Sequence, residues 1–282
     1  MERGVKMVKE FKLNDEITFG DKETPFVLLS GPCALEDRDR VLKIAEGIKK
    51  ITDKLGIPYV FKSSYDKANR SSIESYRGPG LEEGLKLLSE VKERFDLPLL
   101  SDVHTVEQAK IAGEVLDIVQ VPAFLSRQTD LVVAAGETDK IVNVKKGQFL
   151  APWDIDQVVK KIESTGNNRI ILTERGASFG YNNLVVDMRS LPRMKETGYP
   201  VVFDATHSVQ LPGGQGEKSG GERKFVPHLT RAACGVGIDA LFMEVHDNPE
   251  VAKSDSATMI PLDKLEDILK QALAIDEVVK GR

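Results

Sequence analysis

The sequence of 282 residues predicts an α/β fold, a (β/α)8 barrel of the TIM-barrel type in a single domain. Short runs rich in Val, Ile, Leu and Phe alternate eight times with amphipathic stretches, as parallel strands and helices do. Each run ends in residues able to bind or react, and the carboxyl ends of barrel strands carry active sites. No Gly-x-Gly-x-x-Gly follows the first run, which removes the usual dinucleotide-binding open sheet. An open sheet of another kind stays an alternative, since counting elements cannot show closure.

The elements follow in order. Residues 10–24 alternate apolar and polar positions around Asn14-Asp15-Glu16, which predicts a β-hairpin ahead of the barrel. The predicted strands occupy residues 25–31, 59–64, 99–101, 118–121, 141–144, 170–173, 201–204 and 240–244. The predicted helices lie at about 42–55, 81–95, 105–115, 128–137, 154–164, 187–197, 222–236 and 262–279.

Composition and charge narrow the class of protein. A net charge of −5 argues against a nucleic-acid binder, which would carry a basic excess. The two cysteines, Cys33 and Cys234, lie far apart, so we expect no disulfide framework and a reducing compartment. The stretch from Met1 to Lys6 lacks the apolar segment of a signal peptide, and no apolar run approaches the ~20 residues that span a membrane. We therefore expect a cytoplasmic protein without membrane or nucleic-acid partners.

Cations and hydroxyl groups gather just after several predicted strands. They are Lys62, Ser63, Ser64, Lys67, Arg70, Lys145 and Arg175. Lysine and arginine converging on one rim of an acidic protein indicate phosphate binding, with forked contacts from arginine and a point charge from lysine. Surface salt bridges are the alternative, but these cations directly follow apolar strands and should point into the barrel mouth.

A second group combines a thiol, an imidazole and two carboxylates. Its members are Cys33, His207, Glu244 and Asp255. These ligand types suit a divalent metal ion. The four residues are scattered in the sequence, however, and Cys33 alone would more often pack as a small hydrophobic residue. His207 alone also suits acid–base chemistry, so the residues by themselves leave the metal open.

Several longer motifs match one known family. They are Gly31-Pro32-Cys33, the stretch from Phe61 to Ser72, Val144 to Phe149, Leu172 to Gly176, Phe179 to Leu184, and the stretch from Asp204 to Gly221. In these motifs the chain resembles the 3-deoxy-D-manno-octulosonate 8-phosphate synthases, from about Phe26 to beyond Asp255. The resemblance implies a barrel transferase that joins phosphoenolpyruvate to D-arabinose 5-phosphate and water. The implied reaction releases phosphate and is a step in the synthesis of Kdo and lipopolysaccharide.

A sister family, the 3-deoxy-arabino-heptulosonate 7-phosphate synthases, shares the barrel and the phosphoenolpyruvate site but takes erythrose 4-phosphate. That family typically carries Lys-Pro-Arg-Thr where this chain has Lys67-Ala68-Asn69-Arg70. The amide of Asn69 can bind a sugar hydroxyl, which proline cannot do. The resemblance therefore favours arabinose 5-phosphate, with the sister activity as the alternative.

The resemblance implies roles at the phosphoenolpyruvate end of the site. Lys145 and Arg175 would hold its phosphate and carboxylate, with Lys62 and Lys67 completing the charge. Ser63 and Ser64 belong to the same substrate-binding segment. The pocket around the reacting carbons would be lined by Asp102, His104, Gln120 and Asp204.

At the sugar end, the resemblance implies that Lys67 and Asn69 reach the hydroxyls of arabinose 5-phosphate. Arg70 and Ser71 would bind its phosphate across a subunit boundary, which implies a homotetramer.

The resemblance also bears on the metal. Members of the family with cysteine after Gly-Pro depend on a metal ion, whereas members with asparagine there do not. Cys33 implies the metal-dependent group, with His207, Glu244 and Asp255 as the other ligands of a Zn, Fe, Mn or Co ion. The loop that starts at Gly213-Gly214 is expected to close over the substrates.

Two alternatives come from other classes of function. A Schiff-base aldolase would use Lys62 or Lys145 as its amine, with a pKa depressed by neighbouring cations. A barrel without catalysis would only bind phosphosugars.

Overall fold

The computed structural model describes residues 7–213 and 220–282. Residues 1–6, on which the expectation about a signal peptide rests, lie outside the described residues, and so does Gly214 of the expected closing loop.

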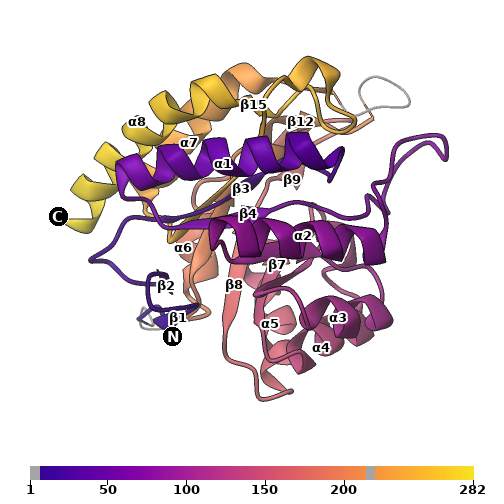
Figure 1. The fold of residues 1–282 in the computed structure, drawn as a ribbon. Helices are drawn as coiled ribbons and strands as arrows, with labels where there is room; N and C mark the ends of the chain where they lie inside the picture. The colour runs from indigo at the N-terminus through magenta and orange to yellow at the C-terminus, as the bar shows by residue number, and fades with distance from the viewer. Residues whose placement is uncertain (1–6, 214–219) are drawn as a thin grey trace.

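Eight parallel strands form a closed barrel (Figure 1). They are β3 (Val27–Gly31), β4 (Tyr59–Lys62), β5 (Leu99–Asp102), β6 (Ile118–Val121), β7 (Ile141–Lys145), β8 (Ile170–Glu174), β11 (Val201–Asp204) and β14 (Ala240–His246). Each strand pairs with the next in this order, and β14 pairs with both β11 and β3, which closes the barrel. The predicted barrel is confirmed, and the open-sheet alternative is wrong.

One α-helix follows each barrel strand and packs on the outside (Figure 1). The helices are α1 (Arg38–Leu55), α2 (Leu81–Phe95), α3 (Val106–Gly113), α4 (Thr129–Glu137), α5 (Ile155–Glu163), α6 (Ser190–Lys195), α7 (Val226–Val236) and α8 (Leu262–Lys280). Helix α1 begins before its apolar stripe because the Asp37 carboxylate accepts the N–H of Arg40 at 2.9 Å and caps it. Helix α6 is shorter than predicted, since Asp187 accepts the N–H of Arg189 in a turn ahead of it.

Short elements connect these units. The strands among them are β9 (Ala177–Ser178), β10 (Leu184–Val185), β12 (Gln210–Leu211), β13 (Gly220–Gly221) and β15 (Ile260–Pro261). The 3-10 turns are η1 (Ala123–Leu125), η2 (Pro152–Asp154), η3 (His207–Val209), η4 (Arg223–Phe225) and η5 (Pro249–Val251). Most of them lie between a barrel strand and its helix, where the residues of the candidate site are found.

The predicted hairpin is confirmed and closes one end of the barrel. Strands β1 (Phe11–Lys12) and β2 (Thr18–Phe19) pair antiparallel, and the Asn14 side chain accepts the N–H groups of Glu16 and Ile17 in the turn. Ile17 and Phe19 are buried in one cluster with the inward-facing residues of the strands. That cluster includes Val27, Leu29, Val60, Leu100, Ile118, Ile141, Ile171, Val202, Ala240 and Phe242. This apolar cluster fills one end of the barrel, so an active site can form only at the opposite end.

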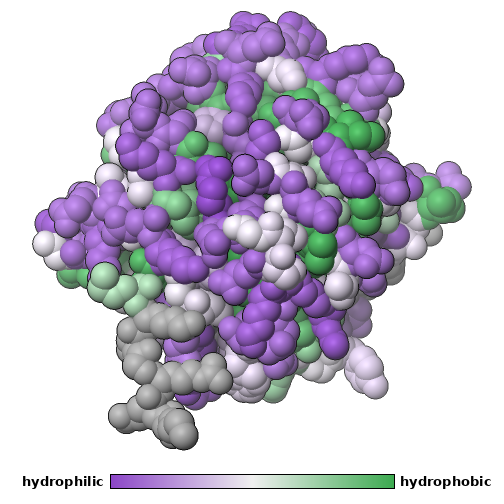
Figure 2. All heavy atoms as spheres, turned by 90° about the horizontal axis from the view of Figure 1, so that it is seen from below, coloured by the Kyte–Doolittle hydropathy of each residue, from purple (hydrophilic) through white to green (hydrophobic). Residues whose placement is uncertain are grey.

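A second apolar layer lies between the strands and the helices. Along β3, Leu28 belongs to this outer layer, whereas Val27 and Leu29 belong to the barrel interior. The alternation follows the two-residue period of a strand. On the face shown in Figure 2, hydrophilic side chains predominate and hydrophobic ones form small, separate groups. No helix in the described parts of the chain is both long and apolar enough to cross a membrane.

Gly31 sets the spacing of the first two barrel strands where the site begins. A Cβ atom at this position would lie 2.1 Å from the carbonyl oxygen of Lys62. Any side chain would therefore push β3 away from β4, on which Lys62 is carried.

We predict that Gly31→Ala lowers the free energy of unfolding by about 3 kcal/mol or more, because an added methyl group overpacks the core against backbone that cannot yield. Urea denaturation followed by circular dichroism measures the change. Gly235→Ala is the matched control, since its Cβ would meet only Ile275, at 4.0 Å, and alanine favours the helix. Equal stability of the two variants would contradict this account of Gly31.

Candidate active site

The predicted site residues come together at the carboxyl ends of the barrel strands. Lys62, Asp102, Lys145 and Asp204 are the last residues of β4, β5, β7 and β11. Each continues an apolar strand, so the strand delivers its polar end to the barrel mouth. Arg175 directly follows the last residue of β8.

A polar cleft with two adjoining cavities opens at this end. The inner cavity is lined by Lys62, Ser64, Lys67, Ala68, Asn69, Asp102, His104, Gln120, Pro122, Ala123, Phe124, Leu125, Lys145, Gln148, Arg175 and His207. The outer cavity shares Lys67, Asn69, Arg175 and His207 with it and extends to Arg70, Ser71 and Asp255. Among the predicted substrate-binding residues, Ser63 is fully buried and lines neither cavity.

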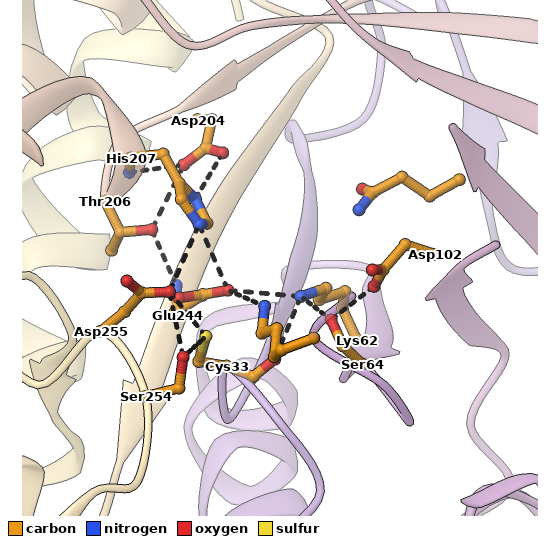
Figure 3. A network of polar contacts seen from close by, with 12 residues as sticks. Cys33, Lys62, Ser64, Asp102, Asp204, Thr206, His207, Glu244, Ser254 and Asp255 are labelled. Carbon is orange, nitrogen blue, oxygen red and sulfur yellow. Dashed lines mark hydrogen bonds and ion pairs between the residues drawn. The ribbon is translucent and has the colours of Figure 1, made fainter. Parts of the chain in front are cut away.

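Three donor groups, two of them buried and one partly buried, converge beside the cleft. One ligand atom each from Cys33, Glu244 and Asp255 lies within 4.8 Å of the other two. The Cys33 Sγ is 2.8 Å from Oδ2 of Asp255 and 2.9 Å from Oγ of Ser254 (Figure 3). The segments that carry these residues follow β3, lie within β14 and precede β15, so the fold unites donors more than two hundred positions apart in sequence.

His207 completes this donor set from the turn after β11. Its Nε2 lies 3.6 Å from Oε1 of Glu244 and 4.0 Å from Oδ2 of Asp255, while its Nδ1 lies 2.8 Å from Oδ2 of Asp204 (Figure 3). Ligands that share one ion with bonds of about 2.0 to 2.3 Å lie about 3 to 4 Å apart. The Oε2 atom of Glu244 is buried without a hydrogen-bond partner among the described residues. Cys33, Glu244 and Asp255 thus fit a divalent metal ion, and the His207 ring lies near enough to Glu244 and Asp255 to offer a fourth ligand.

Burial raises the pKa of the Cys33 thiol well above its usual range, and the charges of Asp255 and Glu244 raise it further. The thiol therefore keeps its proton here and donates a hydrogen bond to Asp255. A divalent cation among these donors would oppose both effects and favour the thiolate.

Buried cations form the other side of the cleft. Lys145 Nζ lies 2.7 Å from Oδ2 of Asp204, and Lys62 Nζ lies 3.3 Å from Oε1 of Glu244. Arg175 donates through Nη2 to Oε1 of Gln210 at 2.7 Å, but its buried Nη1 has no partner in the part of the chain that is described. A buried guanidinium with an unused donor can bind one further acceptor, and its charge favours an anion there.

The ring of Phe242 packs against the ammonium groups of Lys145 and Lys62. Its ring centroid is 3.7 Å from Nζ of Lys145 and 5.2 Å from Nζ of Lys62. The electron-rich face of a ring attracts such cations. The sequence analysis did not single out this residue. Its place in β14, two positions before Glu244, was the available signal.

Asp204 links the Lys145 cation of the cleft to His207. It is fully buried, pairs with Lys145 and His207, and accepts the hydroxyl of Thr206 at 3.2 Å and the N–H of His207 at 2.9 Å. Burial by itself would raise its pKa, but the charges of His207 and Lys145 hold that pKa well below its usual range. For Lys145, burial lowers the pKa and Asp204 opposes the change.

Glu36 joins two of the segments that carry the donor set, and sequence reasoning missed it. Its Oε1 accepts the N–H of Lys253 at 2.9 Å, two residues from Asp255, and lies 3.6 Å from Nε2 of His246. Glu36 itself lies three residues after Cys33. Asp255 is further fixed by Gln210, whose Nε2 donates to it at 2.9 Å.

Known proteins match this chain over nearly its whole length. The sequence model of the DAHP synthetase I family matches residues 8–280. A 2-dehydro-3-deoxyphosphooctonate aldolase of Cyanothece sp. is 59% identical over 269 residues, covering 95% of this chain and 98% of that protein. The chain belongs to the DAHP synthetase I family and, within it, to the 2-dehydro-3-deoxyphosphooctonate aldolases.

Other aldolases of this name are equally similar. The protein of Trichlorobacter lovleyi is 61% identical over 254 residues, or 90% of this chain and 93% of that protein. The protein of Geobacter sulfurreducens is 57% identical over 274 residues, or 97% of this chain and all of that protein. The resemblance noted in the sequence is thereby confirmed, because the octulosonate 8-phosphate synthases carry this aldolase name.

We predict that Asp204→Asn destabilises the fold by about 3 kcal/mol at neutral pH, because it leaves the buried Lys145 without its counter-charge. The measurement is the urea midpoint in the absence of substrates. Glu82→Gln, which removes an exposed partner of Lys86, is the control and should change stability by no more than about 0.5 kcal/mol. A loss at Asp204 as small as that of the control would refute the predicted role.

Proposed function

We propose that this chain catalyses the condensation of phosphoenolpyruvate with D-arabinose 5-phosphate and water. The products are 3-deoxy-D-manno-octulosonate 8-phosphate and inorganic phosphate, on the route to Kdo and lipopolysaccharide. The membership of the chain among the 2-dehydro-3-deoxyphosphooctonate aldolases supports this reaction over a Schiff-base aldolase or a silent binding protein. The main support for this reaction is a cleft in which a basic wall, formed by Lys62, Lys145 and Arg175, faces the acidic donor set.

The basic wall suits phosphoenolpyruvate, which carries a phosphate and a carboxylate. Arg175 offers the unused Nη1 donor, and Lys145 and Lys62 add charge from β7 and β4. Both lysines already pair with carboxylates, so their charges are held in place before an anion binds. Charge fixed in advance in a buried site stabilises an anionic transition state without reorganisation.

The outer cavity suits the phosphate of arabinose 5-phosphate. Arg70 and Ser71 line it, and Arg70 is held by the carbonyl oxygen of Tyr76 at 3.0 Å. Lys67 and Asn69 line both cavities, so they lie between the two phosphate positions. Asn69 can therefore bind a sugar hydroxyl along the path, as the resemblance implies.

The reaction needs two substrates held in one orientation. C3 of phosphoenolpyruvate bonds to the aldehyde carbon, whose oxygen takes a proton, and water adds at C2. The C–O bond to phosphate then breaks and phosphate leaves. Lys67 can donate a proton or hydrogen bond to the aldehyde oxygen, while Arg175 and Lys145 hold the departing phosphate.

We propose that Cys33, His207, Glu244 and Asp255 bind a divalent metal ion, with Zn, Fe, Mn or Co all compatible with this ligand set. When bound, the ion supplies Lewis-acid charge at the acidic side of the cleft. His207 is then a ligand rather than a general base, with Asp204 fixing its ring through Nδ1.

We also propose a homotetramer in the cytoplasm. Exposed aromatic residues flank the cleft on segments that follow β6, β7 and β8, as expected of surfaces covered by another subunit. They are Phe124, Phe149, Trp153, Phe179 and Tyr181, each more than half exposed. Arg70 and Ser71 would then contact substrate across a subunit boundary. Both cysteines are free and buried, which suits a reducing compartment.

We predict phosphate release from phosphoenolpyruvate only when arabinose 5-phosphate is added, with erythrose 4-phosphate at least about tenfold less effective, because Asn69 and the outer cavity match the longer sugar. A coupled phosphate assay measures both rates. Faster release with erythrose 4-phosphate would favour the sister activity. Release without any sugar, or none with either sugar, would overturn the proposed reaction.

We predict that Cys33→Ala loses the bound metal and most of the activity, because one of four ligands is removed. Metal content per chain, measured by mass spectrometry after purification, is the primary readout. Cys234→Ala is the matched control, since that cysteine is buried in α7 away from the cleft. A fully active Cys33→Ala enzyme without metal would refute the ligand assignment.

A further inference from the structure

The side-chain oxygen of Gln108, in the first turn of α3, lies within hydrogen-bond distance of three groups. Its Oε1 accepts the backbone N–H of His104 at 2.9 Å, and the Tyr65 hydroxyl lies 3.2 Å away. Nδ1 of the His104 ring lies 3.1 Å from the same oxygen. A backbone N–H can only donate, so this atom of Gln108 is the oxygen and not the amide nitrogen.

The two ring nitrogens of His104 therefore both face acceptors. Nδ1 must carry a proton to bond the Gln108 oxygen. Nε2 lies 3.0 Å from Oδ2 of Asp102, whose other oxygen accepts a short hydrogen bond from the Ser64 hydroxyl. An ionised carboxylate only accepts, so Nε2 also carries a proton.

Asp102 is the ionised member of this pair. Burial would raise its pKa, but the hydrogen bond and charge of His104, followed by the charges of Lys62 and Lys67, hold that pKa well below its usual range. If the proton were on Asp102 and His104 were neutral, Asp102 would lose its attraction to the charges of Lys62 and Lys67.

We propose that Gln108 is a positioning residue, which holds His104 as an imidazolium and through it fixes the Asp102 carboxylate in the wall of the cleft. Both N–H groups of His104 are used by protein acceptors, so the ring has none to give directly to a substrate. It acts through Asp102, and Asp102 lines the inner cavity beside Lys67 and Gln120. The charge state follows from the hydrogen bonds alone, whereas its effect on turnover rests on the proposed condensation.

The charged and titratable groups around His104 support this state. Asp102 faces it from β5, and Asp66 and Tyr65 face it from the segment after β4, with the Tyr65 ring edge-on at 6.3 Å. Burial by itself would lower the pKa of His104, but the hydrogen bond and charge of Asp102, then the bond to Gln108, raise it. Both effects favour the imidazolium form that the hydrogen bonds of the ring require.

Nitrogen-15 NMR of the histidine rings tests the charge state in the enzyme without substrates. The chain has four histidines, so the spectrum is simple, and loss of one set of signals in His104→Asn assigns it. We expect both ring nitrogens of His104 to be protonated at pH 7. In Gln108→Leu its pKa should fall by roughly one unit, the equivalent of one hydrogen bond to a charged group.

Two further variants keep the test decisive. Gln108→Glu retains the acceptor and adds negative charge, so the pKa of His104 should rise, and this comparison stands even if Gln108→Leu does not fold. Glu107→Gln, an exposed neighbour on the same helix turn, should leave the titration unchanged. A neutral His104 ring at pH 7 in the wild type, or a pKa unmoved in both Gln108 variants, would overturn the proposal.

Kinetics then tests the link to turnover. The imidazolium is lost as pH rises through the pKa of His104, so the alkaline limb of kcat should move to lower pH in Gln108→Leu and return or move higher in Gln108→Glu. A uniform loss of kcat at every pH would show a merely structural role and contradict the proposed effect on turnover. Failure of the condensation itself would leave the NMR result standing, so the two failures are distinguishable.

Discussion

The barrel mouth buries charges of both signs, and the rest of the site depends on keeping them paired. Lys62 and Lys145 are each less than a tenth exposed, and so are Asp204 and Glu244. Isolated charges at such positions would cost several kcal/mol each, but opposed in pairs they remain ionised. The hairpin plug at one end of the barrel and the apolar layers around it leave only the mouth for these groups. Other polar atoms at the mouth have no partner among the described residues, such as the donor Nη1 of Arg175 and the acceptor Oε2 of Glu244, and these atoms are the ones offered to a substrate anion and to the proposed metal cation.

The two sides of the cleft carry different chemistry for a structural reason. The acidic donors come from β14, from the segment before β15 and from the segment after β3, whereas Lys145 ends β7 and Arg175 follows β8. Lys62, at the end of β4, lies beside the acidic donors and pairs with Glu244. Asp204, at the end of the intervening strand β11, and His207, in the turn after it, touch both sides. A change at Asp204 therefore affects the anion side through Lys145 and the donor side through His207. The order of strands around the barrel thus sets the order of chemistry around the cleft.

The barrel and most residues at its mouth could be predicted from the sequence, because each apolar run stops at a polar residue that marks the end of a strand. Apolar runs that stop at Lys62, Asp102 or Asp204 place those residues on one rim without any knowledge of pairing. Sequence reasoning could not find Glu36, since its bond to Lys253 joins positions 217 apart. Nor could it find Phe242, which resembles any other core residue until its ring meets two lysines. Gln108 was within reach: it stands four residues after His104 and follows Thr105, a typical helix cap, so both side chains share one helix start.

We propose that one cleft binds a metal ion on its acidic side and phosphoenolpyruvate on its basic side. Anomalous diffraction from crystals of the manganese-loaded enzyme soaked with phosphoenolpyruvate tests both at once. We expect a metal peak among Cys33, His207, Glu244 and Asp255, with the phosphate or carboxylate of phosphoenolpyruvate on Arg175 and Lys145. A metal peak elsewhere, or phosphoenolpyruvate bound away from Arg175, would contradict it.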